Sequence, residues 1–505
     1  MNDSDRSGGA RNAPLAMGAD EFRRLGHRLV DDVAQLLDTM PERRVARGES
    51  PAEIQALLGS DEGLPENGMD AATLLEETTR LLFDHSLFNG HPRFFGYITS
   101  APAPIGILGD LLASAINPNM GAWILSPVCT EIERQCVAWI AELVGYPADS
   151  GGLLVSGGNM ANMVGLWTAR TAKSIGDVQT AGTRGGPQMR AYVSAETHTW
   201  IEKGSDLSGL GTDAVRWIAT DEHGRMDMDA LRRQIREDRA AGDQPFLVVG
   251  TGGSVSTGIV DPLPDISALC RDEDLWFHVD GAYGAFAAAV PDAPDELRSL
   301  SEADSVAVDP HKWLYSPLEA GCVLVRDAEA LRTTFSYHPP YYHFGVEAVN
   351  YVDYGPQNSR GFRALKVWLA LKQVGRSGYV RMISEDIELA RVLYEAVEAH
   401  PDLEAMSHGL SIAAFRYVPP DLRERASEEP VAEYLDDLNR DVQARMEVDG
   451  EAFVSNAVIG GRYTLRACIV NFNTSRDDVL ALPDIVVRTG RQADEHLRSD
   501  GLPQG

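Results

Sequence analysis

The sequence predicts an α/β fold built on a mainly parallel sheet with helices on both faces. Short apolar, strand-like runs alternate with helical stretches between residues 91 and 380, and Pro- and Gly-rich segments mark the loops. This alternation favours parallel pairing, because parallel neighbours need a crossover connection. The strand-like runs are residues 191–195, 215–219, 246–250, 275–279, 305–308 and 322–325, and the helical stretches between them include residues 228–241 and 264–270.

The N-terminal region is organised differently. Residues 1–18 are rich in Gly, Ser, Asn and Ala, and we expect a disordered tail there. Within residues 19–90, apolar residues recur at helical spacing over 21–39, and a second helix is expected over 71–83. These helices have little core of their own. They therefore pack either on the rest of the chain or on a partner subunit.

The C-terminal region, residues 381–505, changes pattern again. A helix is followed by a strand near residues 410–417, another helix, and a strand near residues 463–471. This order predicts a small α+β domain beside the large domain of residues 91–380.

Composition narrows the class of protein. The 505 residues are 44% hydrophobic, which is ordinary for a soluble globular chain, and no apolar run approaches the roughly 20 residues that span a bilayer. The formal net charge of −30 argues against nucleic acid or an anionic membrane as a partner. Five scattered cysteines show neither disulfide nor metal-ligand spacing, so no metal site is predicted. The first residues carry no secretory signal, and we expect a cytoplasmic enzyme.

The most informative segment runs from Val308 to Trp313. A proline ends an apolar run, and His311 and Lys312 follow at the C-terminal edge of the predicted strand, where ligands bind in open α/β sheets. A lysine held there among apolar and aromatic neighbours is partly desolvated, which favours a nucleophilic amine. Taken alone, a lysine after a strand is more often an ordinary surface residue.

A carboxylate ends a second apolar run, Leu275-Trp276-Phe277-His278-Val279-Asp280. An aspartate at that place is often only a turn former. Beside Lys312, however, Asp280 completes what pyridoxal phosphate (PLP) requires. The lysine holds the cofactor aldehyde as an imine, and the acid keeps the pyridine nitrogen protonated so that the ring can accept electrons. We therefore predict PLP as the cofactor.

Two further segments fit the same cofactor. Gly157, Gly158 and Asn159 follow a short apolar strand and open a predicted helix, and glycines there let backbone N–H groups approach a phosphate. Gly-Gly before a helix is usually only a turn, so this signal depends on Lys312 and Asp280. His198 follows residues 191–195, and its flat imidazole could stack on the pyridine ring. Without the other motifs it would be read as a polar loop histidine.

Together these motifs resemble those of the PLP-dependent group II amino-acid decarboxylases, the family of aromatic-L-amino-acid, glutamate and histidine decarboxylases. The resemblance extends from about residue 21 to about residue 474. It includes His91-Pro92-Arg93-Phe94-Phe95-Gly96-Tyr97, Ser126-Pro127-Val128-Cys129-Thr130-Glu131-Ile132-Glu133, His278-Val279-Asp280-Gly281-Ala282-Tyr283 and Asp309-Pro310-His311-Lys312-Trp313.

The resemblance implies a fold-type-I PLP enzyme that decarboxylates an L-amino acid to the amine and CO₂. It implies a homodimer in which residues 19–90 lie across the partner. The cofactor-binding residues it implies are Lys312, Asp280, Ala282, His198, Gly158, Asn159, Thr251 and His311. Many members have Asn where this chain has Asp309. Because an acid near a phosphate is repulsive, Asp309 is left out of the phosphate ligands, although it can order the loop.

The aromatic, proline-bearing segment that begins at Phe335 and runs to about residue 357 matches the family's catalytic loop. Its tyrosine aligns best with Tyr341, the implied proton donor to the substrate Cα, while the adjacent Tyr342 stays open as an alternative. The loop could also be a packed aromatic lid with no proton role. The implied catalytic residues are thus Lys312, Asp280, His198 and Tyr341.

The sequence identifies the substrate less clearly than the cofactor. Tyr97, Thr251 and Gly121 are expected in the substrate pocket, and an aromatic or other large apolar amino acid is favoured. Arg466 is the one ambiguous candidate for binding a side-chain carboxylate. The alternatives are an oxygen-dependent aldehyde synthase on the same scaffold, an acidic amino-acid decarboxylase and a catalytically silent PLP-fold binding protein. The presence of His198 and Tyr341 favours plain decarboxylation.

Overall fold

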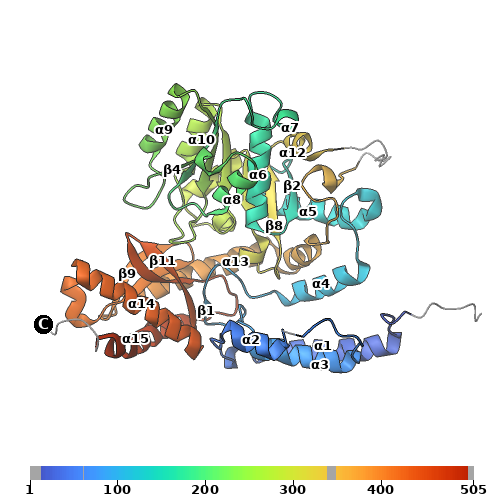
Figure 1. Cartoon of the computed structure of the whole chain (residues 1–505), viewed down its shortest axis with the longest axis vertical. Helices are drawn as coiled ribbons and strands as arrows, with labels where there is room; N and C mark the ends of the chain where they lie inside the picture. Colours follow the sequence, from blue (N-terminus) through green and yellow to red (C-terminus); the bar gives the residue numbers. More distant parts are fainter. Residues whose placement is uncertain (1–12, 61, 338–347, 499–505) are drawn as a thin grey trace, which may run out of the picture.

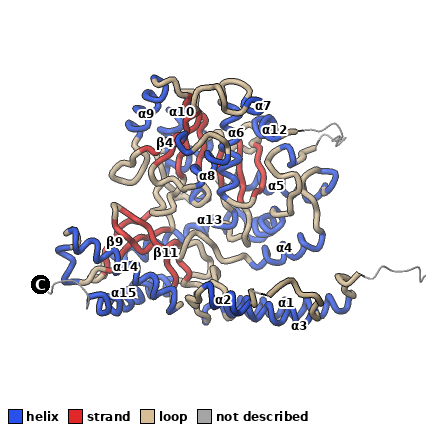
Figure 2. The backbone as a smooth tube through the Cα atoms, in the orientation of Figure 1, coloured by secondary structure: helices blue, strands red, loops and turns tan. Residues whose placement is uncertain are grey.

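The computed structural model describes residues 13–60, 62–337 and 348–498. A seven-stranded sheet forms the centre of the large domain and confirms the predicted α/β class (Figure 2). Five neighbouring strands are parallel, and β8 runs antiparallel to both of its neighbours. In spatial order the strands are β2 (Gly151–Val155), β8 (Gly321–Val325), β7 (Ser305–Val308), β6 (Trp276–Asp280), β5 (Gln244–Thr251), β3 (Met189–Ser194) and β4 (Val215–Ile218).

Helices cover both faces of this sheet, and each face has its own hydrophobic core. Successive strand residues point to opposite faces, so Leu153 and Val155 join one core while Leu154 joins the other. One face packs against α6 (Gly158–Lys173), α8 (Trp200–Leu207) and α12 (Ala328–Phe335). The other packs against α5 (Pro127–Leu143), α9 (Met228–Ala240), α10 (Leu263–Asp272) and α13 (Ala364–Glu398). Burial on both faces explains the continuous apolar runs of these strands.

A second, five-stranded sheet forms the small C-terminal domain (Figure 1). Its strands, in spatial order, are β1 (Phe94–Phe95), β11 (Phe453–Ile459), β12 (Arg462–Cys468), β10 (Ile412–Tyr417) and β9 (Leu403–Gly409). The helices α14 (Glu429–Asp449) and α15 (Arg476–Arg498) and the end of α13 bury its core. Because β1 pairs with β11, residues 94–95 belong to this sheet, although the sequence grouped them with the large domain.

The N-terminal helices lie along one edge of the molecule, below α4, and α1 and α3 run side by side (Figure 1). They are α1 (Ala19–Asp38), α2 (Pro51–Leu58) and α3 (Ala71–His85), followed by α4 (Pro104–Ile116). Leu25 is the one buried residue of α1, and α3 has none. Large apolar side chains therefore remain exposed on these helices: Phe22, Leu29, Val30, Leu74, Leu75, Leu82, Leu108, Leu111, Leu112 and Ile116. None of the described helices is both long and apolar enough to cross a membrane.

Candidate active site

A cavity of about 460 Å³ lies at the carboxyl edge of the large sheet, where β5, β6 and β7 end. Its walls contain all eight residues that the sequence suggested for the cofactor: Lys312, Asp280, Ala282, His198, Gly158, Asn159, Thr251 and His311. The strand ends bring these residues together from positions 154 residues apart in the chain, from Gly158 to Lys312. This edge is the expected ligand-binding edge of an open α/β sheet.

Lys312 lies on the short helix α11 (Pro310–Trp313), directly after β7. Its Nζ is 3.1 Å from Oδ2 of Asp309, and the Lys312 side chain is only 19% exposed. Asp309 is buried, and its other oxygen, Oδ1, has no hydrogen-bond partner among the described residues. Asp309 and Lys312 therefore form an ion pair beside the cavity, a pairing that the sequence did not predict.

Glycines make room for the backbone at the side of the cavity where α6 begins. Gly157 has φ +137°, a conformation that L side chains rarely adopt, and it precedes the first turn of α6. A Cβ on Gly158 would lie 2.6 Å from Asp309 Oδ2 and 2.9 Å from Ala282 Cβ, so only glycine fits without displacement. The N-terminus of a 16-residue helix thus faces the cavity with small residues, as an anion site requires.

His311 closes the same side of the cavity. Its Nδ1–H donates to the carbonyl of Ala320 at 2.7 Å, which leaves Nε2 as the free ring nitrogen. Nε2 lies 3.7 Å from Oδ2 of Asp309. Burial lowers the pKa of His311, and the nearby Asp309 charge opposes this shift only in part. The ring is therefore neutral at pH 7.

Asp280 ends β6 and lines the same cavity. Its Oδ2 accepts a hydrogen bond from the indole Nε1–H of Trp200 at 2.8 Å, and its Oδ1 accepts one from the backbone N–H of Ala282 at 3.2 Å. These two donors fix the carboxylate plane. Thr251 ends the neighbouring strand, where its backbone N–H donates to Asp261 Oδ2 at 2.8 Å.

His198 follows β3 and is exposed in the single chain. Its Nδ1 accepts a hydrogen bond from the backbone N–H of Trp200 at 3.2 Å. In the neutral ring the proton therefore lies on Nε2. Trp200 thus contacts both His198 and Asp280, and the sequence assigned it no role.

The structure does not bring every predicted residue to the cavity. Tyr97 and Gly121 are absent from its described walls. Tyr97 is 58% exposed and packs against Phe453, and Gly121 lies against the carbonyl of Asn358. Their place in a substrate pocket stays a prediction. Tyr341 and Tyr342 lie outside the described residues.

Arg466, which the sequence left ambiguous, lies on β12 beside the cavity. Its guanidinium donates to Ser455 Oγ and to the carbonyl of Val255, and Val255 lines the cavity. Its side chain is buried, which lowers its pKa. Among the described residues no carboxylate pairs with it within 4.0 Å. A substrate carboxylate would supply the missing negative charge.

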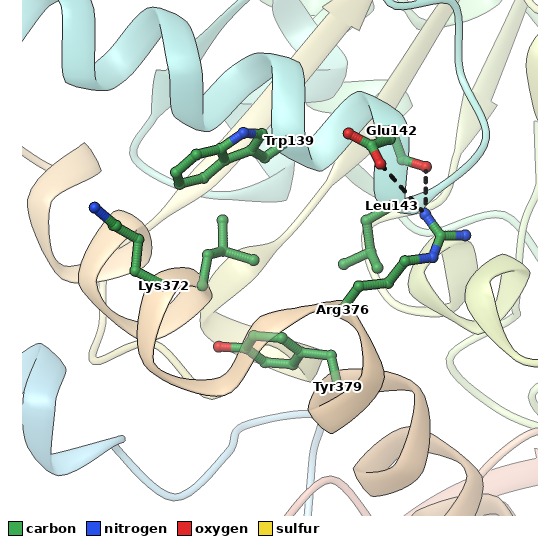
Figure 3. A pocket seen from close by; sticks show the side chains of 7 residues that line it. Trp139, Glu142, Leu143, Lys372, Arg376 and Tyr379 are labelled. Atoms are coloured by element: carbon green, nitrogen blue, oxygen red, sulfur yellow. Dashed lines mark hydrogen bonds and ion pairs between the residues drawn. The ribbon is translucent and has the colours of Figure 1, made fainter.

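A second cavity, of about 340 Å³, lies between α5 and α13 (Figure 3). Arg376 approaches Glu142 at its edge, while Trp139, Lys372 and Tyr379 line it. None of the predicted cofactor residues is there. The cavity at the sheet edge is therefore the candidate active site.

Comparison with known proteins agrees with this geometry. Residues 51–418 match the pyridoxal-dependent decarboxylase conserved domain. The chain is 33% identical to an aromatic-L-amino-acid decarboxylase of Bacillus atrophaeus, over 93% of this chain and 95% of that protein. It is 30% identical to a cysteine sulfinic acid decarboxylase of Mus musculus, over 90% of this chain and 92% of that protein. The crystal structure of Oryza sativa TDC with PLP and tryptamine superimposes with a TM-score of 0.87 at 25% identity, covering 95% and 99% of the two chains.

Proposed function

Because the chain belongs to the pyridoxal-dependent decarboxylase family and is a PLP-dependent amino-acid decarboxylase, we propose that it converts an aromatic or other large apolar L-amino acid to the amine and CO₂. One observation carries the proposal. An amine, Lys312, and a carboxylate, Asp280, line a single cavity from adjacent strand ends, beside a glycine-opened helix N-terminus. The identity to an aromatic-L-amino-acid decarboxylase supports the substrate class.

The residues present fit the cofactor. The cavity volume is within the range of small-molecule sites, about 300–1,000 Å³. The first turn of α6 offers backbone N–H groups where Gly158 leaves space for a phosphate. Asp280 offers an ordered carboxylate to a pyridinium nitrogen, and Lys312 offers an amine. Asp309 is an unfavourable charge for a phosphate bound at Gly158, and it is paired with Lys312.

PLP, when bound, supplies an aldehyde that forms an imine with an amine and a ring that accepts the electrons of the broken Cα–carboxylate bond. Lys312 would hold the cofactor through its amine, and Asp280 would keep the pyridine nitrogen protonated. His198 would stack on the ring, and the small side chain of Ala282 would leave room for the other face.

The substrate is held from the small domain. Arg466 is proposed to bind its α-carboxylate, because this buried cation lacks a carboxylate partner among the described residues and contacts the cavity-lining Val255. Binding of the α-carboxylate at Arg466 would orient the Cα–carboxylate bond for cleavage. Arg466 would thus contribute by positioning the substrate. Tyr341 is proposed to return a proton to Cα, as the sequence resemblance implies.

We also propose that the enzyme is a homodimer. The exposed apolar side chains of α1, α3 and α4 form a surface that the described part of the chain does not cover. An uncovered apolar surface of this extent marks an interaction site. Tyr97, which is exposed in the single chain, would then contribute to a pocket shared by two subunits.

A decarboxylation screen tests the proposed activity. Purified, PLP-loaded protein is incubated with each common L-amino acid, and CO₂ and amine are measured. Aromatic substrates should be fastest, and Lys312→Ala should abolish steady-state turnover of all of them. Lys372→Ala is the matched control, since this amine lies over the Trp368 ring in the other cavity. Steady-state turnover by Lys312→Ala would contradict the assignment of the imine-forming lysine.

A further inference from the structure

Trp200 is the first residue of α8 and is 1% exposed, yet it does not line the cavity. It makes two hydrogen bonds towards cavity residues. Its indole Nε1–H donates to Asp280 Oδ2 at 2.8 Å, and its backbone N–H donates to His198 Nδ1 at 3.2 Å. One residue thus contacts both the carboxylate proposed for the pyridinium nitrogen and the imidazole proposed to stack on the ring.

The indole is itself held in place. The ring of His278 packs edge-on against the ring of Trp200, with centroids 5.9 Å apart and planes at 76°. His278 bonds to Asn162 Oδ1 and Ser305 Oγ, each at 2.8 Å, and Ser305 Oγ accepts from Trp276. A fully bonded network of this kind fixes the donor direction before any ligand arrives.

His278 adds no positive charge beside Asp280. Burial lowers the pKa of His278 to about 4, so this neighbour of Asp280 on β6 is neutral at pH 7. Trp200 donates a neutral N–H to Asp280, so it orients the carboxylate without adding a charge. Neither neighbour therefore competes with a cation in the cavity for Asp280.

We propose that Trp200 is a positioning residue, which orients Asp280 for the pyridinium nitrogen of PLP through its indole N–H and fixes the ring of His198 through its backbone N–H. This inference rests on the proposed role of Asp280. It adds a residue that acts on the cofactor through another side chain. It also gives the indole N–H of Trp200 a role in the site, whereas burial alone would explain only the packing of the ring.

The test is a double-mutant cycle on PLP affinity. Trp200→Phe keeps an aromatic ring and the backbone N–H but removes the indole donor. PLP dissociation constants are measured by titrating PLP-free protein, for Trp200→Phe, Asp280→Ala, the double variant and the native chain. Trp200→Phe should weaken PLP binding about 10-fold, as expected for the loss of a hydrogen bond to a charged group. On the Asp280→Ala background the same change should have less than about a 2-fold effect.

Trp167→Phe is the matched control, because the Trp167 indole donates to Ser208 Oγ at 2.7 Å at the opposite end of α8, and neither residue lines the cavity. It should leave PLP affinity and the visible absorption spectrum of the bound cofactor unchanged, whereas Trp200→Phe should change that spectrum. Trp200→His keeps a ring N–H and should bind PLP more tightly than Trp200→Phe. Equal affinities of these two variants would count against the donor.

Two results would overturn the inference in distinguishable ways. An equal loss of PLP affinity from Trp200→Phe on both backgrounds, with an unchanged cofactor spectrum, would show that Trp200 acts only through packing. Native PLP affinity and turnover in Asp280→Ala would instead overturn the proposed role of Asp280, and the inference with it. Thermal unfolding of each PLP-free variant confirms that the proteins compared are folded.

Discussion

A single methyl group at Gly158 should weaken PLP binding. The new Cβ would lie 2.6 Å from Asp309 Oδ2 and 2.9 Å from Ala282 Cβ. Ordinary van der Waals contact begins at about 3.4 Å, so the neighbouring atoms or the start of α6 must move by about 0.8 Å. Neither neighbour moves freely, because Asp309 is paired with Lys312 and the backbone of Ala282 is bonded to Asp280.

The size of the effect follows from this overpacking. Extra methyl groups in a well-packed site cost about 1–3 kcal/mol. If that cost falls on the PLP-bound state, Gly158→Ala should weaken PLP affinity about 5- to 150-fold. The assay is an absorbance titration of PLP-free protein with PLP. Gly186→Ala is the control, because a Cβ there meets no atom within 4 Å. A folded Gly158→Ala protein with native PLP affinity would refute the glycine cradle.

Three further changes test the substrate, the proton donor and the subunit interface. Arg466→Gln should raise KM about 10-fold or more in steady-state kinetics, because a charge-assisted bond to the substrate carboxylate is lost, and PLP affinity should change little. An unchanged KM would place that carboxylate elsewhere. Tyr341→Phe should slow amine formation about 10²–10⁴-fold and release aldehyde, ammonia and peroxide with oxygen uptake; native amine production without aldehyde would direct attention to Tyr342 and His198. Deleting residues 1–40 should give inactive monomers or aggregates in sedimentation, and a truncated dimer with full activity would contradict the interface.

The residues that line the cavity could be predicted because their signals are local. Lys312 and Asp280 each follow an apolar run, and the carboxyl ends of parallel strands meet at one edge of a sheet. Gly157 and Gly158 stand between a strand and a helix, where a short segment already specifies a turn that admits an anion. The position of the cavity therefore follows from strand order and needs no knowledge of side-chain packing.

What the sequence missed depends on contacts between distant residues. The pairing of β1 with β11 joins residues some 360 positions apart, and β1 has only two residues, too few to show a period. The bond from Trp200 to Asp280 spans 80 residues, and a tryptophan that begins a helix reads as core. A signal did exist for α2, because Ser50 at its N-cap and Glu53 in its first turn form a capping box.

The charges around the cavity show why these distant contacts matter. Burial keeps His278 and His311 neutral, so neither ring competes with a cofactor for the nearby carboxylates. Asp280 lines the cavity with its carboxylate held by an indole N–H and a backbone N–H, while Asp309 is paired with Lys312. Two aspartates at adjacent strand ends thus differ in the neutral or cationic partner that each one contacts. Sequence motifs locate such carboxylates, but only the packing around them shows which one suits the proposed contact with a pyridinium.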